Sequence, residues 1–505
     1  MNDALPRAHG QDRAPSDHDL ADIVHRLAGA RVLVLGDIVL DRYVSGTAGR
    51  LSPEAPIPVL RPTRSRATLG GAANVALNVA SLGGRAILVG VVGDDPAGSE
   101  VQALLAASPG IEARLLAIPG RPTTVKTRFL VGAHQLLRLD EETVEPIDTQ
   151  SAALLLDRFS DALAGAEVVV LSDYAKGVLS DPVLESAIAR ARAAGRLVVA
   201  DPKRHDFAAY RGADVLTPNE AEARTATRID AAEDADAERA GTAALAETGG
   251  AAVLVTRSSK GLTLVRRDCP PLHMPTRARE VADVSGAGDT LVAALAAALA
   301  AGAALPLAAA LANITAGISV AKQGTATVSA EELRAALHLR EVVATDQKIV
   351  TQQQAMEQVA AWRDSGLRVG FTNGCFDLIH PGHVRLLTQA RAACDRLIVG
   401  LNTDASVRRL KGPSRPVQSE TARATVMASL APVDLVVLFD EDTPLEMIRA
   451  LRPDVLVKGA DYTVEQVVGA DLVQGWGGVV TLVDLEQGYS TTGTIKRMTA
   501  GTTAE

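Results

Sequence analysis

The chain of 505 residues is poor in aromatic side chains, poor in cysteine, and short of basic residues relative to acidic ones. Aromatic residues make up 3% of it, and its formal net charge is −9. Proteins that bind nucleic acid along an extended surface need basic stripes and stacking rings, so we expect no nucleic-acid partner. The three cysteines, Cys269, Cys375 and Cys394, are odd in number and lack zinc-site spacing. They favour a reduced, cytoplasmic setting.

Long, strongly apolar stretches are also missing. Residues 1–20 have no apolar segment of the signal-peptide type, and we expect a disordered tail there. Residues 290–321 contain no charged side chain, which satisfies a crude test for a membrane span. The run is mostly alanine and is interrupted by Gly302 and Pro306. It therefore predicts two buried helices of a globular core, and we expect no membrane partner.

What the chain does have is an alternation of short β-branched segments with Ala- and Leu-rich segments, which is typical of α/β proteins with parallel sheets. Its length suits about two to four domains. The predicted strands are 31–36, 86–93, 167–172, 197–201, 214–217 and 252–256, then 369–372, 397–401, 435–439, 454–457 and 479–483. Between the two sets, residues 330–364 are polar and predict helix without a strand. The predicted organisation is a tail at 1–20, a first domain at 21–340, a helical linker at 341–364 and a second domain at 365–505.

A glycine-rich turn at Asp283–Thr290 carries the clearest chemical signal of the first domain. Gly286, Ala287 and Gly288 leave backbone N–H groups bare at a helix start, which suits migrating phosphoryl oxygens. Asp289 can take the proton from an attacking hydroxyl as a general base. A plain glycine turn with an aspartate cap would explain the glycines, but not the other segments that point to the same chemistry.

Two further segments place polar groups where a sugar could bind. Asp37 and Asp41 follow the first predicted strand directly, and α/β sheets bind ligands beyond the carboxyl ends of their strands. Gly70 and Gly71 open a helix, and Asn74 could hydrogen-bond a sugar hydroxyl. Taken alone, the two aspartates would more often be a helix cap, and the glycines are equally typical of tight helix packing.

These segments resemble the two signatures of the ribokinase (PfkB) family, the first at 70–84 and the second at 283–290. The resemblance implies a ribokinase-like α/β sugar kinase that uses ATP. It also implies that Asn219 and Glu222 organise Mg²⁺ and phosphates. The implied ATP-binding residues are Asn219, Glu220, Ala221, Glu222, Lys203, Thr256, Gly286, Ala287 and Gly288.

Lys126, Arg128 and Arg138 add positive charge to the sugar-binding region. Cations there suit a sugar that already bears a phosphate. Ordinary surface salt bridges explain the same three residues equally well. With the acidic pair, the two glycines and Asn74, they complete the predicted sugar site.

In the second domain, His380 and His383 lie on one face of a helix that starts near Pro381, after a strand and a loop. They could donate hydrogen bonds to the α–β phosphate bridge of a nucleotide, where charge develops as pyrophosphate leaves. Gly382 would let the nucleotide base approach the backbone. A metal site is the competing interpretation, but the further ligands that would complete it are missing.

This pattern resembles the cytidylyltransferase-like superfamily and implies a Rossmann-like HxGH nucleotidyltransferase domain. A basic cluster at 408–412 suits a triphosphate, and a hydroxyl-rich helix start near residue 490 suits a phosphate. We expect Cys375 to be a small packing residue rather than a nucleophile. The expected nucleotide-binding residues are Thr372, Cys375, Phe376, Lys411, Ser490, Thr491, Thr492 and Lys496.

Joined in this order, the two halves resemble the family of bifunctional heptose kinase/heptose adenylyltransferases of lipopolysaccharide precursor synthesis. The resemblance implies phosphorylation of D-glycero-β-D-manno-heptose 7-phosphate at C1 by ATP. It then implies adenylyl transfer from ATP to heptose 1-phosphate, giving ADP-heptose and pyrophosphate. We expect phosphosugars and ATP as partners and a homodimer formed through the kinase domain. Two alternatives stay open, namely another bifunctional sugar or polyol kinase-nucleotidyltransferase, such as one that uses CTP, and a nucleotide-sensing regulator.

Overall fold

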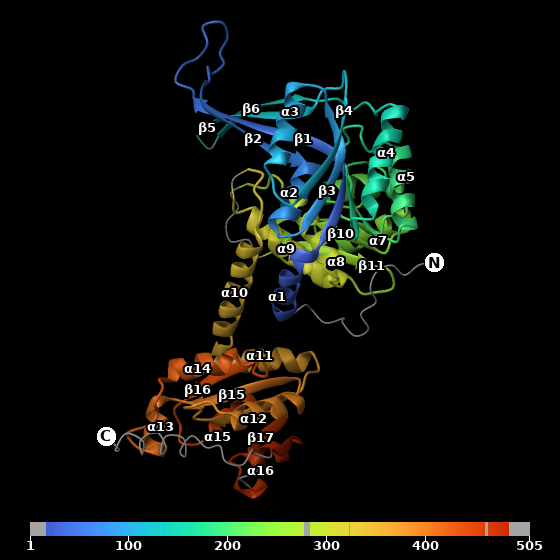
Figure 1. Ribbon diagram of the computed structural model, residues 1–505. Coiled ribbons are helices and arrows are strands. Elements are labelled where there is room, and N and C mark those ends of the chain that lie inside the picture. The colour runs from blue at the N-terminus through green and yellow to red at the C-terminus, as the bar shows by residue number, and fades with distance from the viewer. Residues whose placement is uncertain (1–16, 133, 277–282, 323, 460–462, 484–505) are drawn as a thin grey trace, which may run out of the picture. The chain divides into compact units, whose positions relative to one another are not determined.

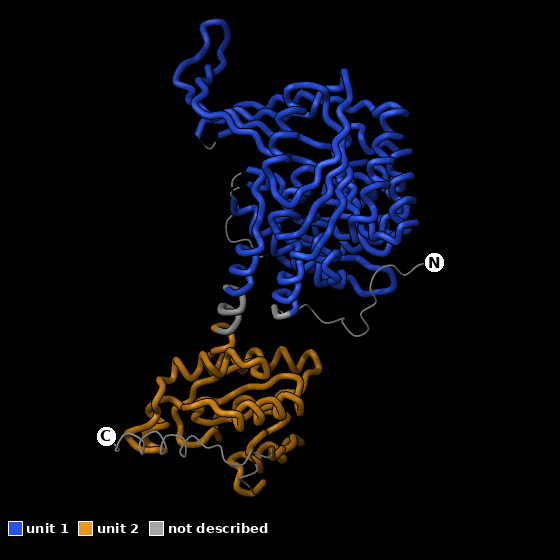
Figure 2. The backbone as a smooth tube through the Cα atoms, viewed as in Figure 1, with its two compact units in different colours: residues 1–338 blue, residues 339–505 orange. Residues whose placement is uncertain are grey.

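The structure is a computed structural model that describes residues 17–132, 134–276, 283–322, 324–459 and 463–483. The chain divides into two compact units, residues 1–338 (unit 1) and residues 339–505 (unit 2), as Figure 2 shows. Each unit has its own sheet and its own hydrophobic core. Each therefore has the anatomy of a separate domain.

Unit 1 is built on a main sheet with the strand order β12-β11-β10-β9-β8-β7-β1-β3-β4 (Figure 1). The strands from β10 to β4 run parallel, whereas β11 pairs antiparallel with both β10 and β12. The bounds are β1 (Arg31–Thr47), β3 (Arg85–Gly93), β4 (Ile111–Ile118), β7 (Val168–Ser172), β8 (Leu197–Asp201), β9 (Val215–Leu216), β10 (Ala252–Thr256), β11 (Leu262–Arg266) and β12 (Leu272–Met274).

Helices cover both faces of this sheet. Because successive strand residues point to opposite faces, Val32 and Val34 of β1 pack into one core, while Leu33 and Leu35 pack into the other. One face carries α1 (Asp17–Arg26), α2 (Ala72–Ser81), α8 (Ala287–Ala300) and α9 (Leu305–Ser319), and the other carries α4 (Thr149–Leu163), α5 (Asp181–Ala193) and α7 (Asp234–Thr248). The remaining helices are α3 (Pro96–Ala106), α6 (Glu220–Thr227) and α10 (Ala330–Gln347), which crosses the boundary between the units.

The first strand is much longer than the predicted 31–36. Beyond Asp37, β1 leaves the main sheet and pairs with β2 (Arg61–Gly71) and β5 (Thr124–Val131), and β6 (His134–Glu141) pairs with β5. The sequence did not indicate this small sheet, because β2 and β6 are largely exposed and lack a buried apolar face. Asp37 and Asp41 therefore lie inside β1, where it passes from one sheet to the other, rather than after it.

Unit 2 holds a parallel sheet with the order β13-β16-β15-β14-β17-β18. Its strands are β13 (Ile349–Val350), β14 (Val369–Gly374), β15 (Arg396–Asn402), β16 (Leu435–Phe439), β17 (Val455–Gly459) and β18 (Val479–Val483). One face packs against α12 (Pro381–Ala392) and α14 (Glu420–Ser429), and the other against α11 (Gln352–Asp364), α15 (Leu445–Leu451) and α16 (Ala470–Gly475). The chain builds β15 and β16 on one side of β14 and then returns to the other side for β17. This order makes the carboxyl end of β14 a topological switch point, where α/β sheets bind ligands.

Two expected boundaries differ from the structure. Residues 17–20 belong to α1, whose Leu20 and Ile23 are buried, so the expected tail is too long. Residues 349–364 are not a linker, because β13 pairs with β16 and α11 buries Ala355 and Val359 in the core of unit 2. The polar sequence hid this role, since only a narrow face of α11 is buried.

The uncharged run 290–321 forms α8 and α9, which pack together in the core of unit 1 as the sequence predicted. Among the helices that the structure describes, none has the length and apolar character needed to cross a membrane.

Candidate functional site

Asp289 lies buried in the first turn of α8, after Gly286, which adopts a left-handed conformation with φ 78°. Its Oδ1 accepts a hydrogen bond from Tyr174 Oη at 2.5 Å, and its Oδ2 accepts one from Asn74 Nδ2 at 2.7 Å. Burial raises the pKa of Asp289 to about 6, although both hydrogen bonds act to lower it. A carboxylate with this pKa is mostly ionised at neutral pH and can accept a proton.

Asn74 is fully buried in α2 and faces Asp289. Asn78 Nδ2 donates to Asn74 Oδ1 at 3.2 Å, and Thr290 Oγ1 donates to Asn78 Oδ1 at 3.2 Å. These contacts tie α2 to α8. The structure thus gives Asn74 a partner that the sequence did not indicate, the carboxylate of Asp289.

Asp37 anchors the loop that follows β7. Its carboxylate accepts hydrogen bonds from the backbone N–H groups of Tyr174 at 2.8 Å, Lys176 at 3.1 Å and Val178 at 3.2 Å. Burial and then the charge of Asp173 raise the pKa of Asp37 to about 6, against the three hydrogen bonds. Asp37 therefore fixes the loop that carries Tyr174. The sequence analysis did not identify this loop as part of the site, although its position after a central strand is where α/β sheets bind ligands.

The predicted sugar-site cations lie on the small sheet, and each is paired. Arg128 donates to Asp41, Lys126 contacts Asp140 and Glu142, Arg138 binds Asp140, and Lys176 binds Glu142. Three carboxylates thus face the three predicted cations and Lys176 of the loop after β7, and the charge of Asp283 also acts on Arg128. The pairing matches ordinary salt bridges.

Gly70 and Gly71 end β2 beside the two aspartates of β1. A Cβ atom on Gly70 would lie 2.3 Å from Asp41 Oδ2, and one on Gly71 would lie 2.4 Å from the Asp37 backbone oxygen. Small residues are therefore required for β2 to approach β1 here.

The predicted ATP-site residues gather at the ends of β8, β9 and β10. Asn219 and Glu222 form a capping box at the start of α6, where each side chain accepts from the other's backbone N–H at 2.9 Å. Glu222 Oε1 also accepts from Lys203 Nζ at 2.7 Å, and Asn219 bridges to Thr256. Glu220 and Ala221 begin α6, while Ala287 and Gly288 begin α8.

Asp201, at the end of β8, is a site residue that the sequence analysis did not single out. Burial raises its pKa well above the ordinary value, and the charges of Glu222 and Asp289 raise it further. Asp201, Glu222 and Asn219 offer the oxygen ligands that Mg²⁺ prefers. Among the described residues, no group of three His, Cys, Asp or Glu side chains could hold a metal ion. These residues therefore fit an ion that is held partly by phosphate oxygens or water.

In unit 2, the loop after β14 leads to His380, which caps α12. The rings of His380 and His383 stack with centroids 3.7 Å apart, and Phe376 meets His383 edge-on at 5.1 Å. Burial lowers the pKa of His380. Burial and then the charge of His380 lower the pKa of His383 to about 4, against a hydrogen bond with the Leu378 backbone. In both rings burial thus disfavours the charged imidazolium form.

Four buried polar atoms at this end of β14 have no hydrogen-bond partner within the part of the chain that the structure describes. They are Thr372 Oγ1, Asn373 Oδ1, His380 Nδ1 and His383 Nδ1. Buried polar atoms are rarely unpaired, so their grouping marks a ligand site. An open cleft of about 680 Å³ lies alongside, lined by Ile379, His380, Pro381, Val384, Arg385, Thr388 and Gln389.

Three further predicted residues have local explanations. A Cβ atom on Gly382 would lie 3.2 Å from the His380 ring, so this glycine makes room for the histidine. Burial raises the pKa of Cys375, against the nearby charges of Lys411 and Arg423, and a thiol with a raised pKa is a poor nucleophile. Lys411 ends α13 (Asp404–Lys411). Ser490, Thr491, Thr492 and Lys496 lie outside the described residues.

Comparison with known proteins decides the family. The model of the pfkB family of carbohydrate kinases matches residues 30–333, and the cytidylyltransferase-like model matches residues 371–496. The bifunctional protein HldE of Caulobacter vibrioides is 56% identical over 483 residues, which cover 95% of this chain and 99% of the relative. HldE of Rhodospirillum rubrum is 56% identical over 482 residues, covering 95% and 97%.

The chain belongs to the HldE family. As an HldE-family member it is a bifunctional enzyme, a sugar kinase joined to a nucleotidyltransferase. The expected function in ADP-heptose synthesis is confirmed.

Solved structures confirm the fold of the first half of this HldE-family chain. Phosphofructokinase-2 from Escherichia coli in complex with potassium aligns with a TM-score of 0.53 at 19% identity, covering 61% of this chain and 99% of that one. Ribokinase from Arabidopsis thaliana complexed with ribose and ATP aligns with a TM-score of 0.51 at 21% identity, with the same coverage. At such identities the likeness concerns the fold alone, and that fold is ribokinase-like.

Proposed function

We propose that Asp289 is the general base of the kinase reaction and that His380 and His383 stabilise the leaving pyrophosphate of the adenylyl transfer. The observation that carries the kinase proposal is the buried carboxylate of Asp289, oriented by two donors at the start of α8. For the transferase it is the stacked pair of imidazoles, each with a buried Nδ1 open to a ligand.

In the kinase unit, Asp289 takes the proton from the C1 hydroxyl of D-glycero-β-D-manno-heptose 7-phosphate as that oxygen attacks the γ-phosphorus of ATP. The backbone N–H group of Gly288 at the start of α8 faces the migrating phosphoryl group, whereas that of Ala287 donates to Val284 O at 3.3 Å. The sugar hydroxyls lie near Asp41 and the two glycines of β2. The three cations Lys126, Arg128 and Arg138 of the small sheet receive the 7-phosphate.

ATP binds the kinase unit at the strand ends that carry Lys203, Asn219, Glu222 and Thr256. Mg²⁺ neutralises phosphate charge when it is bound there. Asn219 and Glu222 already cap α6, so they reach the ion through water or through the phosphates rather than as a closed set of ligands. Lys203, beside Glu222, supplies a positive charge for the phosphate chain.

In the transferase unit, an oxygen of heptose 1-phosphate attacks the α-phosphorus of a second ATP. His380 and His383 donate hydrogen bonds to the bridging oxygen as pyrophosphate departs, where charge is greatest in the transition state. Lys411 supplies positive charge for the triphosphate. The nucleotide site also includes Thr372, Cys375, Phe376, Ser490, Thr491, Thr492 and Lys496.

We further propose that the chain forms a homodimer through the small sheet of unit 1 and works in the cytoplasm, where ATP and phosphosugars are available. Leu136, Leu137 and Leu139 of the outer strand β6 are 43%, 59% and 48% exposed. An apolar strand at a sheet edge favours association with another chain.

Replacement of Asp289 by asparagine tests the kinase base. Asp289→Asn should lower kinase turnover by roughly 10²–10⁴-fold, with sugar binding nearly intact, because only proton abstraction is lost. Phosphorus NMR of the protein with ATP, Mg²⁺ and heptose 7-phosphate would follow the product. The adenylyl transfer rate of the same chain is the control and should not change. A variant that keeps more than about half of its kinase rate would remove Asp289 from the mechanism.

Replacement of either histidine by alanine tests the transferase site. His380→Ala or His383→Ala should depress adenylyl transfer by roughly 10²–10³-fold, with a much smaller effect on apparent ATP affinity. Pyrophosphate release from ATP and heptose 1-phosphate is the measurement, and the kinase rate is the control. The rival metal site predicts that chelation abolishes activity and that Zn²⁺ alone restores it, and this result would contradict the role proposed here.

A further inference from the structure

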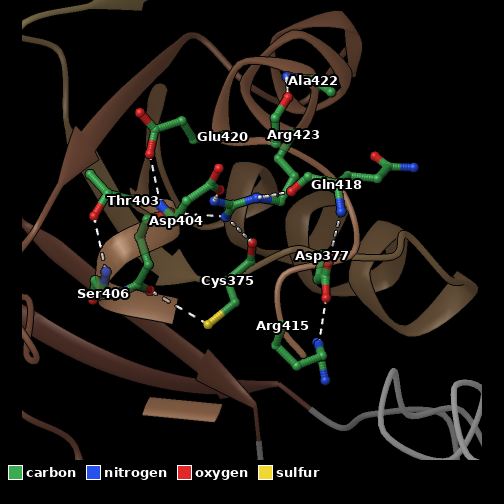
Figure 3. A network of polar contacts seen from close by, with 12 residues as sticks. Cys375, Asp377, Thr403, Asp404, Ser406, Arg415, Gln418, Glu420, Ala422 and Arg423 are labelled. Atoms are coloured by element: carbon green, nitrogen blue, oxygen red, sulfur yellow. Dashed lines mark hydrogen bonds and ion pairs between the residues drawn. The ribbon is translucent and has the colours of Figure 1, made fainter. Parts of the chain in front are cut away.

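Arg423 of α14 is the largest fully buried side chain in the described part of the protein, at 1% exposure. Its Nη1 donates to Cys375 O at 2.6 Å and to Asn402 O at 2.9 Å. Its Nε donates to Gln418 O at 3.1 Å, and its Nη2 donates to Asp404 Oδ1 at 2.7 Å. Figure 3 shows these segments converging on one guanidinium from the ends of two strands and the loop before α14.

A buried guanidinium is costly, because removing an ion from water costs several kcal/mol even after the protein relaxes. Only one of the four acceptors is charged, and that residue, Asp404, keeps 21% of its side chain exposed. An apolar side chain would often fill such a space with no loss of stability. Arginine here indicates a task that an apolar residue cannot perform, namely holding several carbonyl oxygens in fixed directions through its rigid fork of donors.

The shortest of these hydrogen bonds goes to the carbonyl of Cys375, the first residue of the loop 375–380, which joins β14 to α12 and is called the catalytic loop below. Cys375 follows β14 directly, and the next residue, Phe376, has φ 44° in the left-handed region. A bulky residue is strained there and persists only when its surroundings hold it. The Phe376 ring contacts His383 edge-on, so the conformation of this turn reaches the histidine pair.

The other side of the strained residue is also fastened. Asp377 is buried, and its Oδ1 accepts from the backbone N–H groups of Val417 at 2.7 Å and Gln418 at 3.1 Å. Its Oδ2 accepts from Arg415 Nε. Arg423 binds both Cys375 O and Gln418 O. The turn at residues 375–377 is therefore joined to the segment 415–418 twice, once through Asp377 and once through Arg423.

We propose that Arg423 is a positioning residue for adenylyl transfer. It fixes the turn at residues 375–377 against the ends of β14 and β15, and so aims His380 and His383 at the phosphates of the nucleotide. Arg423 itself touches no reacting atom. The inference rests on the histidine roles proposed above.

The variant Arg423→Lys tests this role, because lysine keeps the charge and the stem but cannot reach four acceptors from one nitrogen. We expect the kcat of adenylyl transfer to fall by roughly 10²-fold, as for a small displacement of catalytic groups, with the KM for ATP changed by less than about threefold. Thermal unfolding would verify that unit 2 is folded at the assay temperature. The kinase rate of the same chain should not change.

Arg391→Lys is the control for an arginine of the same unit. Arg391 lies in α12, the helix of His383, with its side chain 32% exposed, Nη1 donating to Cys394 O and Nε paired with Asp434. It contacts none of the residues that hold the catalytic loop among those the structure describes. This variant should keep the kcat of adenylyl transfer.

A double variant separates positioning from simple stabilisation. If Arg423 acts through the histidines, Arg423→Lys added to His383→Ala should slow the enzyme by only a few fold more, because both changes remove the same interaction. Full multiplication of the two losses would overturn the proposal. An unchanged kcat with a lower melting temperature, or a raised KM for ATP alone, would also overturn it.

Failure of the histidine roles is distinguishable from failure of this inference. If His380→Ala and His383→Ala keep their rate, the proposed function fails first. If they lose it and Arg423→Lys does not, only the positioning role fails. Should Arg423→Lys not fold, Asp404→Asn removes the charged acceptor and leaves the buried side chain in place. That variant should lower kcat by about threefold or more at constant KM, and an unchanged kcat would contradict the proposal.

Discussion

At the scale of single residues, the kinase site depends on the carboxylate of Asp289, whose surroundings have opposing effects on its pKa. Burial raises the pKa of Asp289 to about 6, while the donors Tyr174 and Asn74 act to lower it. The charge of Asp41 raises this pKa and that of Lys203 lowers it. Because the base must be ionised, kinase kcat/KM should rise with pH through about 6 and level off above it.

The variant Tyr174→Phe should shift this rise of kinase kcat/KM to higher pH. Loss of the phenol hydroxyl removes a hydrogen bond that favours the ionised form of Asp289, so the pKa of the carboxyl should rise by roughly one unit. The measurement is kcat/KM of the kinase between pH 5 and 9. Tyr210→Phe is the control, because Tyr210 is a buried tyrosine that donates to Asp173 at 2.7 Å rather than to Asp289. If kcat/KM rises at the same pH in both variants as in the wild-type protein, Asp289 is not the titrating group.

At the scale of elements, the start of α8 determines how the base and the phosphoryl group meet. Gly286 has φ 78°, and a Cβ atom there would lie 2.9 Å from Asn74 Nδ2. Gly288, two residues later, has open space around its Cβ position. Glycine is therefore required at position 286 by backbone conformation and space, whereas neither constraint applies at position 288.

Gly286→Ala should destabilise unit 1 by roughly 1–2 kcal/mol, the cost of a left-handed conformation for an L-residue, and should lower the kinase rate by displacing Asn74. Gly288→Ala should change stability by less than about 0.5 kcal/mol. It should still raise the KM for ATP if its N–H faces the phosphates. Denaturant unfolding and kinase kinetics of both variants are the measurements. Equal loss of stability in the two would refute this distinction.

At the scale of the whole molecule, the two activities reside on separate sheets. Unit 1 contains all the strands of the main and small sheets, and unit 2 contains β13 to β18. The polar segment before residue 365 belongs with the second sheet, because α11 and β13 pack there.

Fragments of the chain test this division. A fragment of residues 1–338 should fold and phosphorylate heptose 7-phosphate, and a fragment of residues 339–505 should fold and adenylylate heptose 1-phosphate, because each keeps its own core. A fragment that starts at residue 365 loses β13 and α11, and should be insoluble or much less stable, since apolar residues such as Phe371 and Ile398 lose their cover. Circular dichroism, solubility and the two assays are the measurements. A stable, active fragment that starts at residue 365 would contradict this assignment and show that α11 is a linker.

The sequence by itself was enough to predict the two α/β halves and most of the main strands, and it supplied Asp289, His380 and His383 as the candidate catalytic residues. These features are local, because apolar periodicity defines each strand, and a strand–loop–helix motif places its polar residues within a few positions. The small sheet escaped prediction because two of its strands, β2 and β6, are largely exposed and have no alternation of buried and exposed residues.

Only the tertiary structure decided which distant groups orient these residues. Tyr174 and Asn74 lie 115 and 215 residues from the Asp289 that they contact, and Arg423 lies 48 residues from Cys375. No periodicity or spacing relates such pairs. A buried tyrosine, asparagine or arginine has the same local sequence pattern whether it orients a catalytic group or only fills a core. Its partner depends on how the sheet brings strand ends together, and that arrangement exists only in the folded chain.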